Sequence, residues 1–384
     1  MPSPYLTAAE AANWLGIKPA SLYVYVSRGL LRSEPGDGRS RRYRRDDIDR
    51  LMARRDGAEG ALDFGAPVLD SALTRIAEGR FAYRGRDAIK LALRASLEDV
   101  ACLLWGTRAD IAFAPRNVPA PPPRSASSNA TARLQATLPL AGSADPGATA
   151  REPKARAAAA GRVLRLVAAT LVGKKPSAVA CDALLAESWK LDRIGASLVR
   201  SALVLCADHE LNPSSFVARC VASTGASLYD AVTAGLAALQ GPLHGGASRR
   251  AEAWLREFDG VDDIVMEIAE RARRGERFPG TGHPLYPMGD PRGRFLFDAL
   301  AKTFPHDAGQ KRVRQIADAV ATQTGTPANI DFALAALARV LKLPADAPMQ
   351  IFTLGRTVGW LAHALEQQDS GRLIRPRARY TGPV

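Results

Sequence analysis

Apolar residues recur every three or four positions along most of the chain, which is the period of amphipathic helices. This pattern predicts helices over residues 155–171, within 178–207, within 214–240, from 247 to about 275, over 311–324, over 330–343 and near 356–368. The segment from Leu69 to Trp105 is also interpreted as helical, on both sides of Phe81-Ala-Tyr83-Arg84-Gly85. Almost no strand pattern follows residue 45, so we expect an all-α fold for this part of the chain.

The first 57 residues follow a separate pattern. Thr7-Ala-Ala-Glu10 is a capping box that opens a short helix, and Gly16 ends this helix. Pro19 then begins a second helix, which Gly29 stops. Two short helices joined by a tight turn form a helix-turn-helix, whose second helix can enter the major groove of DNA.

A basic, turn-rich hairpin follows at residues 32–45, and a further helix is expected from 46 or 47 to about 55. Segment 28–45 holds seven arginines against Glu34 and Asp37, a local charge of +5. The region from about Tyr5 to Arg55 resembles the winged helix-turn-helix of MerR-like regulators, which implies duplex DNA as a partner. The alternative is a basic hairpin on a small protein-docking module. The residues expected to meet DNA are Ser21, Tyr23, Tyr25, Arg28, Arg39, Arg41, Arg42 and Arg44.

Composition narrows the class of protein. A length of 384 residues allows two or three domains. No apolar run is long enough to span a membrane and the N-terminus does not resemble a signal peptide, so we expect a cytoplasmic protein. The four cysteines lack CxxC spacing, which favours reduced thiols over a metal site. The net charge of +13 indicates a polyanionic partner, either nucleic acid or a phosphate-bearing molecule such as coenzyme A, unless it reflects a general bias toward arginine.

The candidate chemistry begins at residues 277–296. Pro279, Gly280 and Gly282 predict a loop that presents His283. A second turn at 289–291 places Arg292 at the start of a helix. A histidine can hydrogen-bond a carbonyl oxygen and an arginine can bind a carboxylate through two nitrogens, so the pair suits an anionic carbonyl substrate.

Four further motifs join this stretch: Asp208-His209-Glu210, Gly241-Pro-Leu-His244-Gly-Gly, Pro327-Ala-Asn-Ile-Asp331-Phe332 and Phe352-Thr-Leu-Gly-Arg356, with Ile374-Arg375-Pro in the tail. In this order, from about Leu69 to the C-terminus, the set resembles the citrate synthase family. The resemblance implies a large helical domain at 58–246 and 344–384 and a small one at 247–343, after a helix-turn-helix domain at 1–57.

The resemblance also implies an activity, namely condensation of acetyl-CoA or propionyl-CoA with oxaloacetate to give citrate or 2-methylcitrate and free coenzyme A. The catalytic trio would be His244, His283 and Asp331, with Asp331 kept ionised as a base by its place at a helix start. The residues expected to bind oxaloacetate are His209, Arg292, Phe352, Arg356 and Arg375. The loop of Pro279, Gly280, Thr281 and Gly282 would meet acyl-CoA as co-substrate, with no metal and no permanently bound cofactor. A homodimer is expected, in which Arg375 reaches the partner's site.

Two departures from the family pattern stand out. Pro284 and Pro287 occupy positions that are often basic in the family, and the second of these is thought to meet coenzyme A phosphates. Arg273, Arg274 or Arg277 could substitute for it. Residues 112–150 are rich in Pro, Ala, Ser and Gly and are expected to be irregular and without chemistry. An alternative function is a transcriptional regulator whose synthase-like part senses a metabolite without turning it over.

Overall fold

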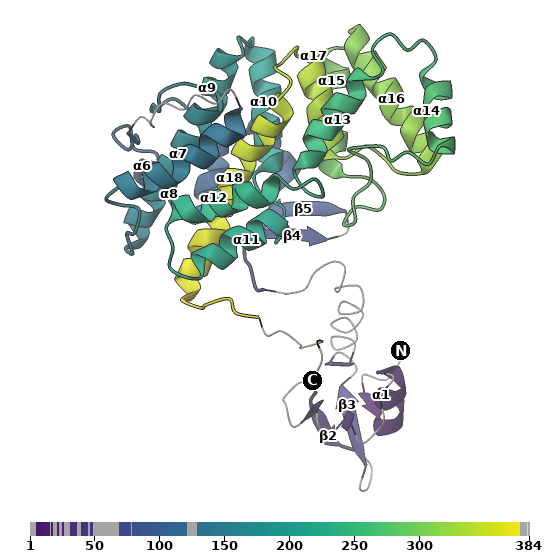
Figure 1. Cartoon of the computed structure of the whole chain (residues 1–384). Coiled ribbons are helices and arrows are strands. Elements are labelled where there is room, and N and C mark those ends of the chain that lie inside the picture. The colour runs from purple at the N-terminus through teal and green to yellow at the C-terminus, as the bar shows by residue number, and fades with distance from the viewer. Residues whose placement is uncertain are drawn as a thin grey trace. The chain divides into compact units, whose positions relative to one another are not determined.

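The computed structural model describes residues 5–15, 17, 21–22, 25–26, 31–36, 40–44, 47–48, 69–77, 79–120, 129–376 and 382. The chain forms two compact units (Figure 1). One comprises residues 1–70 with 378–384, and the other comprises residues 71–377.

The N-terminal unit contains a small antiparallel sheet of order β1-β3-β2 and one fully described helix. Its elements are β1 (Tyr5–Thr7), α1 (Ala8–Trp14), β2 (Ser33–Pro35) and β3 (Arg41–Arg44). The predicted capping box is confirmed, since Thr7 Oγ1 accepts from Glu10 N at 3.3 Å and Thr7 N donates to Glu10 Oε2 at 2.8 Å. The predicted basic hairpin is confirmed in β2 and β3, with Tyr43 buried in the core. Most of the expected second helix and of the helix after residue 46 lies outside the described residues.

The larger unit begins with an antiparallel sheet, where the sequence pattern predicted helices. Its strands are β4 (Thr74–Ala77), β5 (Arg80–Tyr83) and β6 (Arg86–Asp87). The helical prediction was wrong for β4 and β6, which pair with the stretch between the predicted helices. That stretch is β5, where burial has the strand period of two: Phe81 and Tyr83 are buried, while Arg80 is exposed. Arg84 and Gly85 both have positive φ, 44° and 79°, as a tight hairpin turn between β5 and β6 requires.

The rest of the larger unit is helical, as predicted outside residues 112–150. Its helices are α4 (Ala88–Arg94), α5 (Leu97–Trp105), α6 (Ala109–Ala112), α7 (Ala130–Ala144), α8 (Pro153–Leu171), α9 (Cys181–Ser188), α10 (Arg193–Cys206), α11 (Pro213–Ala222), α12 (Leu228–Leu239), α13 (Gly246–Arg256), α14 (Ile264–Arg273), α15 (Pro291–Thr303), α16 (Ala308–Thr324), α17 (Ile330–Val340) and α18 (Ala347–Ser370). In the described part of the chain, no helix combines the length and apolar character that a membrane span needs.

Helix α7 contradicts the irregular structure expected for residues 112–150. Asn129 caps the helix, its Oδ1 accepting from Thr131 N at 2.9 Å. Leu134 and Leu138 are fully buried where α7 packs against α8 and α12, and Pro139 is tolerated inside the helix. The apolar spacing of four residues therefore outweighed the loop-like composition.

Helix α18 is the central element of the larger unit and is buried along nearly its whole length (Figure 1, yellow). It begins at Ala347, about two turns before the predicted start. Gly355 and Gly359 let it approach α10 closely, because a Cβ atom at these positions would lie 2.7 Å from Leu203 O and 2.5 Å from Ala207 O. The close packing brings Arg356 beside the segment that follows α10.

Candidate active site

The loop that carries His283 is attached to the start of α17. Gly280 has φ of 75°, and a Cβ atom there would lie 2.8 Å from Phe332 N, so this position requires glycine. Asn329 N donates to Gly280 O at 2.8 Å, and Asn329 Nδ2 donates to Gly282 O at 2.9 Å. These bonds place the predicted acyl-CoA loop and His283 against the helix that begins just before Asp331.

His283 lies in a cluster of three rings. Its ring centroid is 5.1 Å from those of His209 and Tyr286, and His209 Nε2 lies 2.9 Å from the Tyr286 hydroxyl. Leu285 N donates to His283 Nδ1 at 3.2 Å, so the proton of the neutral imidazole lies on Nε2. Burial and the Arg292 charge lower the pKa of His283 to about 4, and the same two causes lower the pKa of His209 well below its usual value. Both rings are therefore neutral hydrogen-bonding groups at neutral pH.

His244 is held by Ser214. Its Nε2 lies 2.8 Å from Ser214 Oγ, which also contacts Asn212 Oδ1 at 2.8 Å and accepts from Trp360 Nε1 at 3.0 Å. Burial, followed by the Arg356 charge, lowers the pKa of His244 to about 4. This imidazole is also neutral and is fixed in orientation.

Asp331 lies in the first turn of α17 and is half-buried. The residue that caps the helix is Asn329, whose Oδ1 accepts from Asp331 N at 2.9 Å. Ser248 Oγ donates a short hydrogen bond to Asp331 Oδ1. Burial raises the pKa of Asp331 despite this bond and the charges of Arg292 and Arg356. Loss of hydration therefore opposes the helix dipole, which is expected to keep the carboxylate ionised as a base.

Two arginines predicted to bind oxaloacetate are buried but differently paired. Arg292 Nε and Nη2 donate to Asp290 at 3.0 Å and 2.8 Å. Arg356 Nε donates to Cys206 O at 3.0 Å, its guanidinium lies 4.9 Å from the centre of the Phe352 ring, and its buried Nη2 has no partner among the described residues. Burial lowers the pKa of Arg356. An unpartnered cationic nitrogen in the interior is the feature that a bound anion would satisfy.

The structure does not bring Arg375 to the other site residues of its own chain. It lies exposed in the tail that follows α18. Of the arginines near the His283 loop, Arg274 is paired with Glu276 at 2.8 Å, while Arg273 and Arg277 are exposed without a salt bridge in the described residues.

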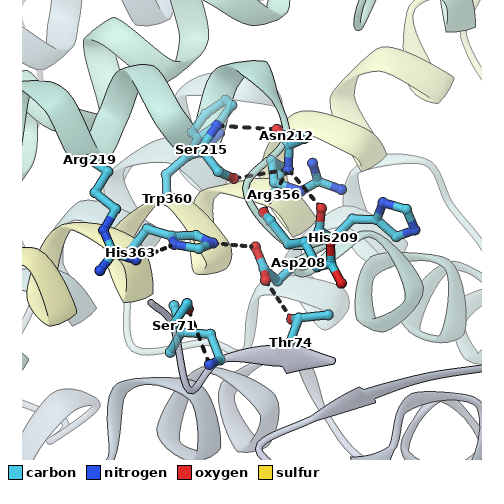
Figure 2. Close-up of polar contacts among 12 residues, drawn as sticks. Ser71, Thr74, Asp208, His209, Asn212, Ser215, Arg219, Arg356, Trp360 and His363 are labelled. Atoms are coloured by element: carbon cyan, nitrogen blue, oxygen red, sulfur yellow. Dashed lines mark hydrogen bonds and ion pairs between the residues drawn. The ribbon is translucent and has the colours of Figure 1, made fainter. Parts of the chain in front are cut away.

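Sequence reasoning missed several residues that complete the site. Ser214, Ser248 and Tyr286 contact the catalytic candidates directly, and His363 contacts Asp208, the neighbour of His209 (Figure 2). Tyr286 could have been suspected because it lies inside the His283 motif. The partners of the two serines and of His363 lie at least 30 positions away along the chain, so no local signal indicated them. In the described part of the chain, no group of three or more His, Cys, Asp or Glu side chains is arranged to hold a metal ion.

The candidate DNA-binding residues belong to the N-terminal unit. Arg41 and Arg42 are exposed on β3, and Arg44 is half-buried. Glu34 lies 3.8 Å from Arg42 and 3.7 Å from Arg44, so part of the local charge is compensated. Ser21 and Tyr25 are also half-buried. Tyr23, Arg28 and Arg39 lie outside the described residues.

Comparison with known proteins supports both parts of this description. Residues 116–377 match the family described as "Citrate synthase, C-terminal domain", and residues 5–56 match the family described as "Helix-turn-helix domain". Citrate synthase 2 of Bacillus subtilis is 37% identical over 218 residues, which are 56% of this chain and 54% of that protein. 2-Methylcitrate synthase 1 of Corynebacterium glutamicum is 33% identical over 184 residues, 47% of this chain and 48% of that protein. The chain therefore spans about half the length of the curated relatives it matches.

Solved structures show the same fold over more of the chain. Citrate synthase from Pyrobaculum aerophilum has a TM-score of 0.68 at 25% identity, over 83% of this chain and 91% of that one. Citrate synthase from Thermoplasma acidophilum, in a ternary complex with carboxymethyl coenzyme A and oxaloacetate, has a TM-score of 0.65 at 23% identity, over 85% of this chain and 96% of that one. These likenesses confirm the predicted synthase-like fold, and the match at residues 5–56 confirms the helix-turn-helix. The finer resemblance to MerR-like regulators stays a prediction.

Proposed function

Because the chain belongs to the citrate synthase family, we propose that it condenses an acyl-CoA with oxaloacetate and releases free coenzyme A. One observation carries the proposal: the Phe352 ring lies 6.5 Å from the His244 ring and 4.9 Å from the Arg356 guanidinium, so a buried cation with an unsatisfied nitrogen lies near a neutral catalytic histidine. A condensation that forms an enol and acts on a dicarboxylate needs a base, hydrogen-bond donors and a cation. The site offers one carboxyl group, two neutral imidazole rings and one unsatisfied guanidinium nitrogen.

In the proposed reaction, Asp331 removes a proton from the carbon next to the thioester carbonyl. The negative charge that develops on the thioester oxygen is stabilised by a hydrogen bond from His244. In the structure the single Ser214 hydroxyl proton is directed at Asn212 Oδ1, so the neutral ring presents Nδ1–H as this donor when that proton turns to His244 Nε2. The enol carbon then attacks the ketone of oxaloacetate, whose oxygen accepts from His283 Nε2–H. Water hydrolyses the resulting thioester and releases the thiol.

Recognition of oxaloacetate would rest on Arg356 Nη2, with Arg292, His209 and Phe352 completing the pocket. Arg375 would come from the partner chain of a homodimer, which agrees with its exposure away from the other site residues. The division into a large domain (58–246 and 344–384) and a small domain (247–343) belongs to the same proposal. It would let acyl-CoA enter beside the loop at 279–282, with Arg273 or Arg277 near its phosphates. A cytoplasmic location is also part of this proposal.

The test is release of free thiol from acetyl-CoA and from propionyl-CoA, measured side by side with and without oxaloacetate. We expect release that depends on oxaloacetate, with citrate or 2-methylcitrate identified by mass. The sequence does not distinguish the two acyl groups, so their ratio of kcat/KM assigns the substrate. No release above the oxaloacetate-free rate with either thioester would refute the enzyme proposal.

DNA binding by the N-terminal unit is a second proposed function. The observations that favour it are the helix-turn-helix match and the exposed Arg41 and Arg42 on β3. The unit would then tether a catalytically active synthase to duplex DNA. A regulator that only senses its ligand would bind oxaloacetate and DNA but release no thiol.

A further inference from the structure

Each polar atom of Asp208, the residue before His209, has a polar neighbour, and the contact of its Oδ1 is an ion-pair distance without hydrogen-bond geometry. Asp208 is fully buried, and its Oδ2 accepts from Thr74 Oγ1 at 2.5 Å while its Oδ1 lies 3.3 Å from His363 Nε2 (Figure 2). The Tyr83 hydroxyl lies 3.2 Å from Asp208 O and accepts from Asp208 N at 3.3 Å. A residue fixed in this way dictates the direction in which the next side chain leaves the backbone.

The His363 ring also contacts an arginine through the nitrogen that faces away from Asp208. Arg219 Nη1 faces His363 Nδ1 at 3.4 Å and also donates to Glu366 Oε2 at 2.7 Å. Because a guanidinium has only donors, His363 Nδ1 must accept, and the ring proton lies on the Nε2 that faces Asp208. These contacts connect Arg219 on α11, His363 on α18 and Asp208 in the segment between α10 and α11.

The residue after His209 is anchored too. Glu210 has φ of 51°, a left-handed conformation that is costly for a residue other than glycine. Its Oε1 accepts from Ile76 N at 3.1 Å. Strand β4 therefore holds Asp208 through Thr74 and Glu210 through Ile76, one on each side of the histidine.

We propose that Thr74, Tyr83 and His363 are positioning residues for oxaloacetate binding. They clamp Asp208 so that His209 is held next to Tyr286 and His283 before the substrate arrives. The inference rests on the proposed function, since it assigns His209 to oxaloacetate. It also gives the small sheet β4-β5-β6 a role, because two of its three strands supply Thr74 and Tyr83.

The test is Thr74→Val, which keeps the shape of the side chain and removes the hydroxyl that bonds Asp208. We expect oxaloacetate to bind about tenfold more weakly in a direct titration, the scale of one lost hydrogen bond. KM for oxaloacetate should rise by a similar factor, with kcat and KM for acyl-CoA close to wild type. Thr74→Ser should restore binding. Thr233→Val removes a similar hydroxyl, bonded to Tyr229 O at 2.8 Å, and serves as the matched control.

A second pair of variants covers the case in which Thr74→Val does not fold. His363→Gln can still donate to Asp208 and should keep most of the affinity, whereas His363→Leu should lose it. A lower melting temperature with unchanged oxaloacetate affinity in these variants would overturn the positioning role and leave the proposed function standing. A wild-type protein that neither binds oxaloacetate nor releases thiol would overturn both.

Discussion

Two buried arginines of the site should respond in opposite ways to the same substitution. Arg292 is neutralised by Asp290 through two hydrogen bonds, and both side chains are almost fully buried. Arg356 has no bonded carboxylate, and burial lowers its pKa. We therefore predict that Arg356→Gln weakens oxaloacetate binding at little cost in stability, whereas Arg292→Gln destabilises the protein even without substrate.

The magnitudes follow from these contacts. Arg292→Gln leaves the Asp290 carboxylate buried without its cation, a loss of about 3–5 kcal/mol in the free energy of unfolding. Arg356→Gln gives up the bond to Cys206 O, roughly 1 kcal/mol, but also removes a charge that burial disfavours. Its effect on binding is the loss of a charge-assisted hydrogen bond, about 1.5–3 kcal/mol, or roughly 10- to 150-fold in affinity.

The assay pairs thermal and denaturant unfolding of the ligand-free variants with direct titration of oxaloacetate. Arg314→Gln is the control, since this exposed arginine pairs with Asp318 on the surface of α16. The reasoning would be refuted if Arg356→Gln lost as much stability as Arg292→Gln, or if it bound oxaloacetate as tightly as the wild type.

Three further predictions follow from the proposed functions. Asp331→Ala and His244→Ala should each lower kcat at least about a hundredfold while oxaloacetate still binds, and near-normal turnover by either would contradict the trio. In the full chain, DNA binding should weaken steeply with salt, and Tyr25→Ala should relax sequence preference more than Arg44→Ala, as footprints at several salt concentrations would show. Mixing inactive His244→Ala and Arg375→Ala subunits should restore activity in heterodimers, and no recovery after verified exchange would exclude a site shared between chains.

Much of the site was predictable because its residues lie in short, rigid motifs. The turn at Gly280 and Gly282, the helix start before Arg292 and the break around His209 all follow from residues whose backbone preferences are strong. The structure has these features at the predicted places, with α15 starting at Pro291 and α11 capped by Asn212. Local chemistry determines such features, so a sequence pattern can reveal them.

The remaining features depend on contacts between distant segments. Strand β4 was assigned to a helix because a four-residue strand has too few positions to show a clear period. The direction of the Asp331 pKa shift depends on burial by helices that the sequence cannot place. The bond from Ser248 to Asp331 joins residues 83 positions apart, and the one from Thr74 to Asp208 spans 134. Only the packed fold makes these residues neighbours.

The neutral histidines of the site should make stability depend on pH. Burial lowers the pKa of His244 and His283 from 6.5 to about 4, so between these values the unfolded chain binds protons that the folded one does not. Their contribution to the free energy of unfolding is therefore complete above about pH 6.5 and falls as the pH drops toward 4. Each ring keeps some contact with water, so we expect a loss of roughly 1 kcal/mol per histidine between about pH 7 and 5. Asp331 opposes this trend because its pKa is raised. The test therefore compares the wild type with His283→Gln by denaturant unfolding at about pH 7 and pH 5. The free energy of unfolding of His283→Gln should fall by less than that of the wild type. Equal losses would show that burial does not keep the ring neutral.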